Sequence, residues 1–269
     1  MILGADPEFF LVNKRGTAVP AHRLFRDKTK KHSSSRGEVF RDGFAIELNP
    51  IPTGCREVLV YSMYKLLCSV TTRAARYGLH IRACPTIRIN LSTMTRAPRD
   101  VRTFGCDGSL DAYSLEEKHP EIDALTHPLR YAGGHMHISS DNTRVTWIRS
   151  REQAAEFIRI LDDKLGLPFT VLFRSPGMFA RRRFYGQAGE FRLQHYNSFL
   201  YEDSHGVEYR TPGPEIWHSS VTASLAFGIF RDCAERFTEL RKRLRKDTAR
   251  QAAVAHAINT GEGAIKLLR

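Results

Sequence analysis

Apolar and polar positions alternate with a period of two in several parts of the chain, which is typical of β-strands. Residues 1–12 are apolar apart from Asp6 and Glu8, and Asn13-Lys14-Arg15-Gly16 is typical of a hairpin turn that leads into a second strand. The strands that these patterns predict cover residues 1–12, 17–20, 39–49, 80–90, 130–139, 184–196 and 206–211.

Other segments have apolar residues spaced closer to a helical period and predict helices that face a core. Residues 54–77 form the first of these helices. Ser150 and Gln153 have the spacing of a capping box, and an apolar stripe at helical spacing follows them. Residues 215–246 are predicted as one long helix, and the tail from Thr248 is predicted to be helical as well.

Strands and helices mix along the chain without the strict alternation that a parallel sheet requires. The predicted fold class is therefore α+β, with a mainly antiparallel sheet and helices packed on one side. The length of 269 residues fits a single domain over residues 1–269, with a helical C-terminal part from about residue 215. Residues 22–37 are basic, serine-rich and poor in apolar side chains, which indicates a surface loop.

The composition indicates a soluble globular protein, because no apolar run reaches the roughly 18–20 residues that a membrane span needs. The first residues lack the basic flank and apolar stretch of a secretory signal. The five cysteines are widely spread and form no C-x-x-C pair. Together these features predict a reduced, cytoplasmic location.

The net charge of +12 predicts attraction to an anionic partner, which could be nucleic acid, a nucleoside triphosphate or an acidic peptide. The sequence contains no P-loop, no G-x-G-x-x-G and no G-x-S-x-G motif. Any nucleotide must therefore be held in another way.

Acidic residues inside predicted strands are the first candidates for chemistry. In Asp6-Pro7-Glu8 the two carboxylates project from the same face of a strand, where their repulsion favours a divalent cation such as Mg²⁺. Glu47 lies among apolar neighbours, where an unpaired carboxylate would cost several kcal/mol. The alternative is a solvated strand edge for the first pair and a surface position for Glu47.

Two histidines in Gly133-Gly134-His135-Met136-His137 also lie on one face of a predicted strand. The glycines before them allow a ligand or another backbone segment to approach closely. Imidazole groups can ligate a metal or donate a hydrogen bond to phosphate. Two hydrogen-bonded core histidines are the alternative interpretation.

Arginines accompany the acidic residues in the second half of the chain. Glu208 and Arg210 are two residues apart, as are Glu190 and Arg192, so each pair can direct a carboxylate and a guanidinium into one cleft. Cross-strand ion pairs are the alternative. The run Arg181-Arg182-Arg183 could clamp a triphosphate or grip nucleic acid, or could be a solvated basic loop.

Taken in order, Asp6-x-Glu8, Asp42-Gly43 with Glu47, Gly134-His135-x-His137 and Val207 to Pro212 resemble the motif series of the glutamine synthetase and glutamate–cysteine ligase superfamily. Within it the chain is most similar to the short carboxylate–amine ligases, or amidoligases, of the phiEco32-like phage type (type 2). Their Tyr-Gly-x-x-Gly-Glu-Phe-Arg and Gly-Val-Glu-Tyr-Arg signatures match residues 185–192 and 206–210, and the likeness covers about residues 3–213.

This resemblance implies a curved, mainly antiparallel sheet with helices on its convex face and with Mg²⁺ or Mn²⁺ ions bridging ATP to the substrates on its open face. Arg210 would stabilise charge on the transferring γ-phosphoryl group, and His137 and Arg183 would contact phosphate or the acyl phosphate. Arg181 and Arg192 would add nucleotide contacts, and the acid paired with Glu47 would be Asp42 or Glu38. The implied metal ligands are Asp6, Glu8, Glu47, His135 and Glu208.

The expected function is thus an ATP- and Mg²⁺-dependent carboxylate–amine ligase that forms an amide through an acyl phosphate, in the cytoplasm of a bacterium or a phage-infected host. Its substrates would be a small-molecule or peptide carboxylate and an amine, with residues 104–108 as a candidate substrate loop, and nucleic acid or a modified nucleotide as a further partner. The alternatives are a basic, non-catalytic nucleic-acid-binding protein and a metal-dependent hydrolase.

Overall fold

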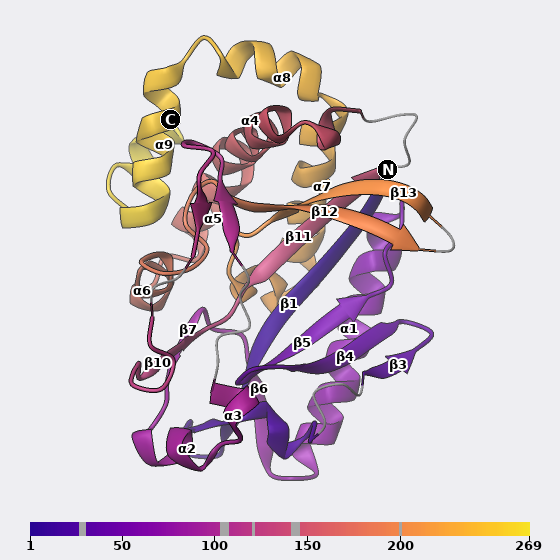
Figure 1. Ribbon diagram of the computed structural model, residues 1–269, viewed down its shortest axis with the longest axis vertical. Helices are drawn as coiled ribbons and strands as arrows, with labels where there is room; N and C mark the ends of the chain where they lie inside the picture. The colour runs from indigo at the N-terminus through magenta and orange to yellow at the C-terminus, as the bar shows by residue number, and fades with distance from the viewer. Residues whose placement is uncertain (27–30, 103–107, 120–121, 141–145, 199–200) are drawn as a thin grey trace.

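A large antiparallel sheet organises the molecule in the computed structural model, which describes residues 1–26, 31–102, 108–119, 122–140, 146–198 and 201–269 (Figure 1). Nine strands follow the order β3-β4-β5-β1-β11-β13-β12-β8-β9, and β2 and β6 pair with one end of β1. β7 and β10 form a separate antiparallel pair. The strands are β1 (Ile2–Asn13), β2 (Ala18–Val19), β3 (His32–Ser34), β4 (Gly37–Asp42), β5 (Ala45–Pro50), β6 (Leu79–Arg82), β7 (Thr86–Arg88), β8 (Ser109–Asp111), β9 (Glu117–Lys118), β10 (Leu129–Tyr131), β11 (Gly134–Ser140), β12 (Glu190–Ser198) and β13 (Tyr201–Tyr209).

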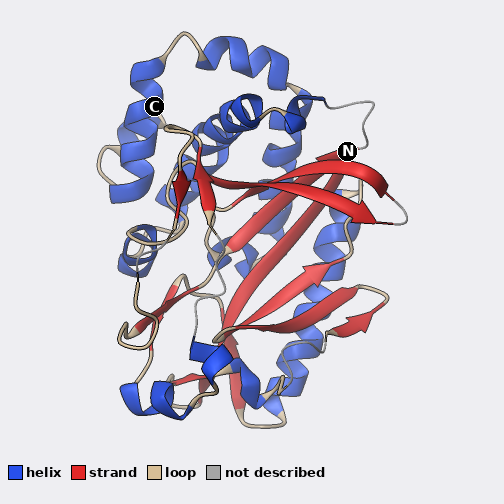
Figure 2. Ribbon diagram, viewed as in Figure 1, coloured by secondary structure: helices blue, strands red, loops and turns tan. Residues whose placement is uncertain are grey.

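Helices cover one face of the central strands and leave the other face open toward the viewer in Figure 2, with α1 and α7 behind the sheet. The longer helices are α1 (Arg56–Ala75), α4 (Arg151–Leu161), α7 (Ser220–Glu235), α8 (Phe237–Leu244) and α9 (Thr248–Thr260). The shorter ones are α2 (Leu91–Arg96), α3 (Arg99–Arg102), α5 (Leu167–Leu172), α6 (Pro176–Arg182) and α10 (Ala264–Leu267), with short helical turns at η1 (Ala21–Arg23), η2 (Thr146–Arg149), η3 (Asp162–Gly166) and η4 (Pro214–His218). The predicted α+β class, with an antiparallel sheet and helices on one side, is confirmed.

Strand β1 lies at the centre of the sheet, and its alternation decides which face is buried. Leu3, Ala5 and Phe9 point into the main apolar core between sheet and helices. Because successive side chains of a strand point to opposite faces, Asp6 and Glu8 point to the open face. The polar positions of β1 therefore mark the side on which a ligand can approach.

The open face becomes apolar again near the C-terminal end of β1. Phe10 and Val12 belong to a second, smaller apolar cluster that also contains Met94 of α2 and Val101 of α3. This cluster covers one end of the open face, next to the carboxylates of β1.

The helix predicted at residues 54–77 and the hairpin after residue 12 are confirmed: β2 pairs with β1 through Leu11–Val19 and Val12–Ala18. Ser150 caps α4, as its Oγ accepts a hydrogen bond from the Gln153 backbone N–H at 3.3 Å.

Several predicted segments have other boundaries in the structure: residues 39–49 divide between β4 and β5, and of residues 184–196 only the part from Glu190 is strand. Residues 215–246 form η4, α7 and α8 rather than one helix, because Ser219 starts a new helix as its N-cap and Arg236 interrupts the helical backbone. Residues 80–90 and 130–139 each divide between two strands in different sheets. Part of the predicted loop at residues 22–37 is β3, which pairs with β4.

Among the described residues, none of the helices combines the length and the apolar character that a membrane span requires.

Candidate active site

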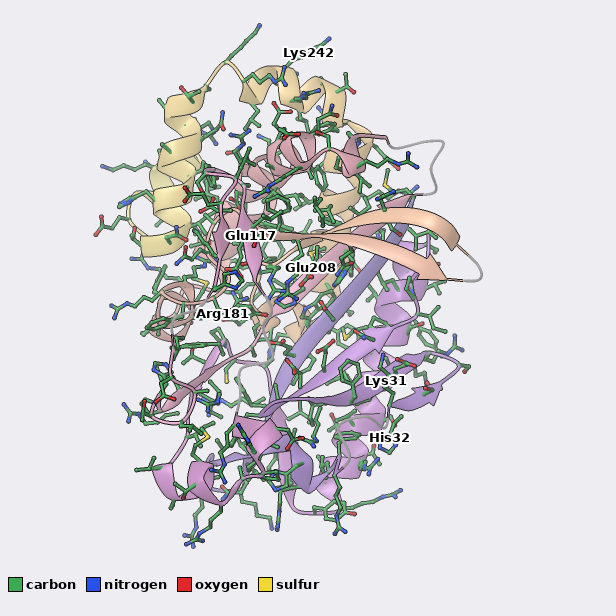
Figure 3. All side chains as sticks on the ribbon, viewed as in Figure 1. Lys31, His32, Glu117, Arg181, Glu208 and Lys242 are labelled. Atoms are coloured by element: carbon green, nitrogen blue, oxygen red, sulfur yellow. The ribbon has the colours of Figure 1, made fainter. Side chains whose placement is uncertain are left out.

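The register of the central strands brings the predicted acidic and histidine side chains together on the open face. Asp6 of β1 lies opposite His135 of β11, and Glu8 lies opposite Glu47 of β5. His137 of β11 lies opposite Glu208 of β13. All five predicted metal ligands therefore lie on adjacent strands, and Figure 3 shows Glu208 near the middle of the molecule.

One group of potential ligands consists of Asp6, His137 and Glu208, which each have one ligand atom within 4.8 Å of the others. His137 Nε2 lies 2.7 Å from Asp6 Oδ1. His135 Nδ1 also lies between the two acids, 3.3 Å from Asp6 and 3.1 Å from Glu208 Oε1. Both histidines therefore face the same carboxylates, although the sequence had assigned only His135 to the metal.

A second group consists of Glu8, Asp42 and Glu47, again within 4.8 Å of one another. Asp42 reaches Glu47 because the hairpin between β4 and β5 places Asp42 opposite Ala45, two residues before Glu47. The sequence left Asp42 and Glu38 as alternatives for this partner. The structure favours Asp42, because Glu38 instead pairs with Lys31 at 2.9 Å.

Gly133 and Gly134, which precede His135, each lie where a side chain would not fit, and the obstacle differs between them. A Cβ atom on Gly133 would collide with the imidazole of His135, and one on Gly134 would collide with the Gly213 carbonyl. The backbone N–H of Gly133 donates a hydrogen bond to the carboxylate of Glu8. Gly133 therefore contacts Glu8 of the second group through its backbone and leaves room for the imidazole of His135 beside the first group.

Burial and mutual repulsion change the acidity of the second group. Burial, together with the charges of Asp42 and Asp6, raises the pKa of Glu8 to about 7. Burial and the neighbouring carboxylates Asp6 and Glu8 raise the pKa of Glu47 well above its usual value. Carboxylates crowded in this way favour either a proton or a cation between them.

Ion pairing dominates the first group. Burial opposes the positive charge of His137, but the neighbouring Asp6 outweighs this effect and raises the pKa of His137 to about 9. Burial likewise opposes the charge of Glu208, but Arg210 and a hydrogen bond from His135 lower its pKa to about 2. His137 and His135 lower the pKa of Asp6 in the same way. The two histidines and Arg210 therefore supply the positive charge that faces the carboxylates of this group.

Both groups fit a divalent cation. Carboxylate oxygens suit Mg²⁺ and Mn²⁺, and a histidine nitrogen adds preference for Mn²⁺ in the group of Asp6, His137 and Glu208. The side chains of the two groups come from strands β1, β4, β5, β11 and β13 of one sheet.

Cation binding is expected to strengthen as the pH rises, because it must displace protons from Glu8, Glu47 and His137, whose pKa values are raised. Where the proton leaves His137, the dissociation constant for Mn²⁺ should rise about tenfold per pH unit as the pH falls below about 9, and where it leaves Glu8 the same rise should begin below about 7. Calorimetry at several pH values, in two buffers of different ionisation enthalpy, would measure the affinity and count the protons. An affinity that is independent of pH would contradict this assignment.

The arginine predicted to stabilise phosphoryl charge is ion-paired in the structure. Arg210 Nη1 donates to Glu208 Oε1 at 2.5 Å, and its Nε donates to Glu190 Oε1 at 3.4 Å. Its guanidinium also lies 5.1 Å from the centre of the Tyr185 ring, whose hydroxyl is hydrogen-bonded to His135 Nε2. Arg210 thus lies beside the first ligand group in a buried network.

Strand β12 adds two polar side chains to the same face. Arg192 lies opposite Glu208, and its Nη1 is 4.0 Å from Glu208 Oε2. Gln194 bridges the group, since its amide nitrogen donates to Glu208 at 3.1 Å and its oxygen is 2.9 Å from His137 Nδ1. Arg192 Nε also donates to the carbonyl of Gly108 at 3.2 Å. The rest of the candidate substrate loop at residues 104–108 lies outside the described residues.

The three consecutive arginines have different environments. Arg181 is fully buried, and its guanidinium donates to the backbone carbonyls of Arg210 and Thr211 at 3.0 and 2.9 Å (Figure 3). Arg182 is also buried and donates to the carbonyl of Ile258. This burial speaks against both a phosphate clamp and a solvated loop for these two residues. Only Arg183 is exposed and free to meet a ligand.

A cleft of about 550 Å³ adjoins the first ligand group. Asp6, His137 and Gln194 form its polar end, while Ile2 and residues 49–52 form much of the remaining wall. The cleft therefore combines a charged end with a largely apolar body.

Two site residues were missed from the sequence. Gln194 continues the alternation of Glu190 and Arg192, so the period of two could have identified it. Tyr185 was noted only as part of a motif, and no local pattern indicates that its hydroxyl reaches His135, fifty residues earlier in the chain.

The match to one family model agrees with the chemistry of the site. The family described as phage phiEco32-like COOH.NH2 ligase type 2 matches residues 126–261, about half of the chain. A comparison with curated proteins gives no significant match. Among solved structures, the chain is similar to GmaS without ligand, with a TM-score of 0.40 and 13% identity. The match covers 96% of this chain and 65% of the GmaS chain, so this chain spans less than two thirds of it. It is also similar to a novel glutamine synthase homolog, with a TM-score of 0.40 and 14% identity over 98% of this chain and 67% of that one.

Proposed function

Since the chain belongs to the phage phiEco32-like carboxylate–amine ligase family, type 2, we propose that it joins a carboxylate to an amine in a reaction that consumes ATP and requires Mg²⁺ or Mn²⁺. The observation that carries this proposal is the pair of ligand groups on the open face of one sheet. Their spacing across β5, β1, β11 and β13 suits a site in which a nucleotide and a second anionic group meet.

The two groups of side chains correspond to two proposed cation positions. Asp6, Glu208 and a histidine would hold one ion, and Glu8, Asp42 and Glu47 would hold the other. When bound, such ions neutralise phosphate charge and polarise the phosphoryl group. They would also relieve the repulsion among the carboxylates, whose raised pKa values reflect it.

The nucleotide is proposed to occupy the cleft beside the first group. Its volume of about 550 Å³ lies within the usual range of small-molecule sites. Ile51 and the two prolines beside it offer an apolar wall for a base, while Asn49 and Ser139 offer hydrogen bonds. A triphosphate bound there would extend past His137 toward Asp6 and Glu208.

The proposed chemistry has two steps. A carboxylate oxygen of the substrate attacks the γ-phosphorus, so that the bond to the β-phosphate oxygen breaks and ADP leaves. The amine nitrogen then attacks the acyl carbon, loses a proton and expels inorganic phosphate, which leaves an amide. Activation is needed because a carboxylate is a poor electrophile, and phosphorylation gives it a leaving group.

Arginine side chains are proposed to stabilise the charge that moves during these steps. Arg210 and Arg192 lie beside Glu208 and would face the transferring phosphoryl group. Arg183, which is exposed at the end of α6, would contact the second anionic substrate. Arg181 instead fixes the backbone of Arg210 and Thr211 and is a positioning residue in this proposal.

The test is transfer of an isotope from substrate to phosphate. Carboxylates labelled with oxygen-18 would be incubated with the protein, ATP, Mg²⁺ and a panel of amines, and the phosphate released would be analysed by mass spectrometry. One labelled oxygen per phosphate, together with amide and ADP, is the expected result.

A variant with Glu8 and Glu47 changed to Gln is the control, and it should release no labelled phosphate while remaining folded. Unlabelled phosphate from ATP without amide would mean that the protein is a hydrolase. Absence of metal-dependent ATP binding by calorimetry would overturn the proposal altogether.

A further inference from the structure

The positive charge of the chain is concentrated in two segments that the ligase site does not use. Residues 10–26 and 73–102 contain eleven Lys and Arg side chains and a single acid, Asp100. Their net charge of +10 accounts for most of the +12 of the whole chain. The rest of the molecule is therefore close to neutral.

These two segments lie side by side in the structure. β6 pairs with the end of β1, so that Leu79 lies opposite Asn13 and Arg82 opposite Phe10. α2 and α3 pack on the same apolar cluster as Phe10 and Val12. Together they form the lower end of the molecule in Figure 1, opposite α8 and α9, and nitrogen-tipped side chains project from this end in Figure 3.

We define the exposed cations of this end as the basic lobe. None of them takes part in an ion pair with an acid elsewhere in the described part of the chain, and Asp100 pairs with the buried Arg41 instead. By contrast, Arg236, Arg243 and Arg250 of the C-terminal helices all pair with acids. The basic lobe consists of Lys14, Arg15, Arg23, Arg26, Arg76, Arg82, Arg88, Arg96 and Arg99.

We propose that the basic lobe binds nucleic acid through its phosphate backbone. Nucleic acid carries closely spaced phosphates, and each one that a cation neutralises releases a counterion, which favours binding at low salt. Eight of the nine side chains are arginines, whose planar guanidinium groups suit phosphate oxygens. The inference does not depend on the ligase reaction.

An acidic protein surface is a poorer match for this lobe. Protein interfaces usually have an apolar centre from which charged residues are depleted. Tyr77 and Leu91 are the large apolar side chains exposed among the described residues of these two segments, at 64% and 66%, and the exposed Arg76 directly precedes Tyr77. An exposed tyrosine beside an arginine is instead suited to stacking on an unpaired base.

The part of the basic lobe that α2 and α3 carry lies on the same side of the sheet as the ligand groups, whereas Arg76 follows α1 on the other side. Phe10 and Val12, which anchor it, share the face of β1 that carries Asp6 and Glu8. Lys14 follows Glu8 by six residues along the strand direction, which corresponds to roughly 20 Å. Nucleic acid bound at this part of the lobe would therefore lie next to the ligand groups.

The test is binding of labelled nucleic acid, measured by fluorescence anisotropy with DNA and RNA oligonucleotides of about 24 nucleotides at about 50 to 200 mM KCl. The expected result is saturable binding whose dissociation constant rises linearly with salt on logarithmic axes. Changing Arg82, Arg88 and Arg96 to Glu together should weaken binding at least about tenfold and reduce the salt slope by roughly 2 to 3. The same three residues changed to Lys should keep most of the affinity.

The matched control is Lys242→Glu, Lys246→Glu and Lys266→Glu, which reverses three exposed cations at the opposite end of the molecule. This variant should bind nearly as well as the unchanged protein, and circular dichroism should show that both variants are folded. Equal losses in the two variants would overturn the assignment to the lobe. Absence of binding at the lowest salt, or displacement by polyglutamate as efficient as by nucleic acid, would overturn nucleic acid as the partner.

Discussion

Changing Glu208 to Gln is expected to lower the rate of amide formation by about 10²–10³-fold. Glu208 is a buried member of the first ligand group. It contacts His135, Gln194 and Arg210 and lies opposite His137. Gln keeps the shape and most hydrogen bonds but removes the charge that a cation needs and that compensates Arg210. Steady-state kinetics and Mn²⁺ calorimetry would measure both effects.

The matched control is Glu117→Gln, which removes a carboxylate that is exposed on β9 (Figure 3). Its activity and Mn²⁺ affinity should equal those of the unchanged protein. If the Glu208 variant is folded, binds Mn²⁺ with normal affinity and remains active, Glu208 is not a ligand.

Changing Asp162 to Ala is expected to lower the free energy of unfolding by about 3–5 kcal/mol. Asp162 is fully buried and accepts hydrogen bonds from the hydroxyls of Tyr209 at 2.7 Å and Tyr113 at 3.0 Å, with Thr211 Oγ1 at 3.4 Å. Its removal would leave the hydroxyls of Tyr209 and Tyr113 without this acceptor, whereas Thr211 Oγ1 still donates to the Gln187 carbonyl at 2.7 Å. Because Tyr209 lies between Glu208 and Arg210, activity should fall as well. Urea unfolding would give the loss of stability.

The neighbouring Asp163→Ala variant is the control, since Asp163 forms an ion pair with a partly exposed Arg250 and should cost about 1 kcal/mol or less. The pH dependence gives a second test. Burial raises the pKa of Asp162 to about 7, so its contribution to stability should decline as the pH rises from about 4 to about 7 and stay constant above that. Asp162→Asn should remove this decline, and an unchanged pH profile would contradict the assignment.

Local alternation was sufficient to predict which side chains share a face. The spacing of two residues in Asp6-Pro7-Glu8 and in His135-Met136-His137 identified both pairs as neighbours on a strand, and the structure places them on one face of adjacent strands. The order of the motifs along the chain supplied the family. These signals are contained in short segments and do not require knowledge of the fold.

Contacts between distant segments could not be predicted in the same way. The choice between Asp42 and Glu38 depends on the register of the hairpin between β4 and β5. The turn of this hairpin sets the register, and the spacing of apolar residues does not reveal it. The burial of Arg181 depends on the carbonyls of Arg210 and Thr211, about thirty residues away. β8 and β9 contain only three and two residues, too few to show a period, and they lie in the turn-rich part of the sequence.

The central position of β1 also sets the order in which the protein can be assembled during synthesis. β1 leaves the ribosome before the other described strands of its sheet, yet one of its neighbours is β11, and the proposed ligand Glu208 is 200 residues downstream of Glu8. At a synthesis rate of about 5–20 residues per second, the acidic face of β1 waits roughly 10–40 s for the strands that complete it. During that interval the nascent chain exposes an unpaired strand edge, so chaperone demand should be greatest before residue 140 has emerged.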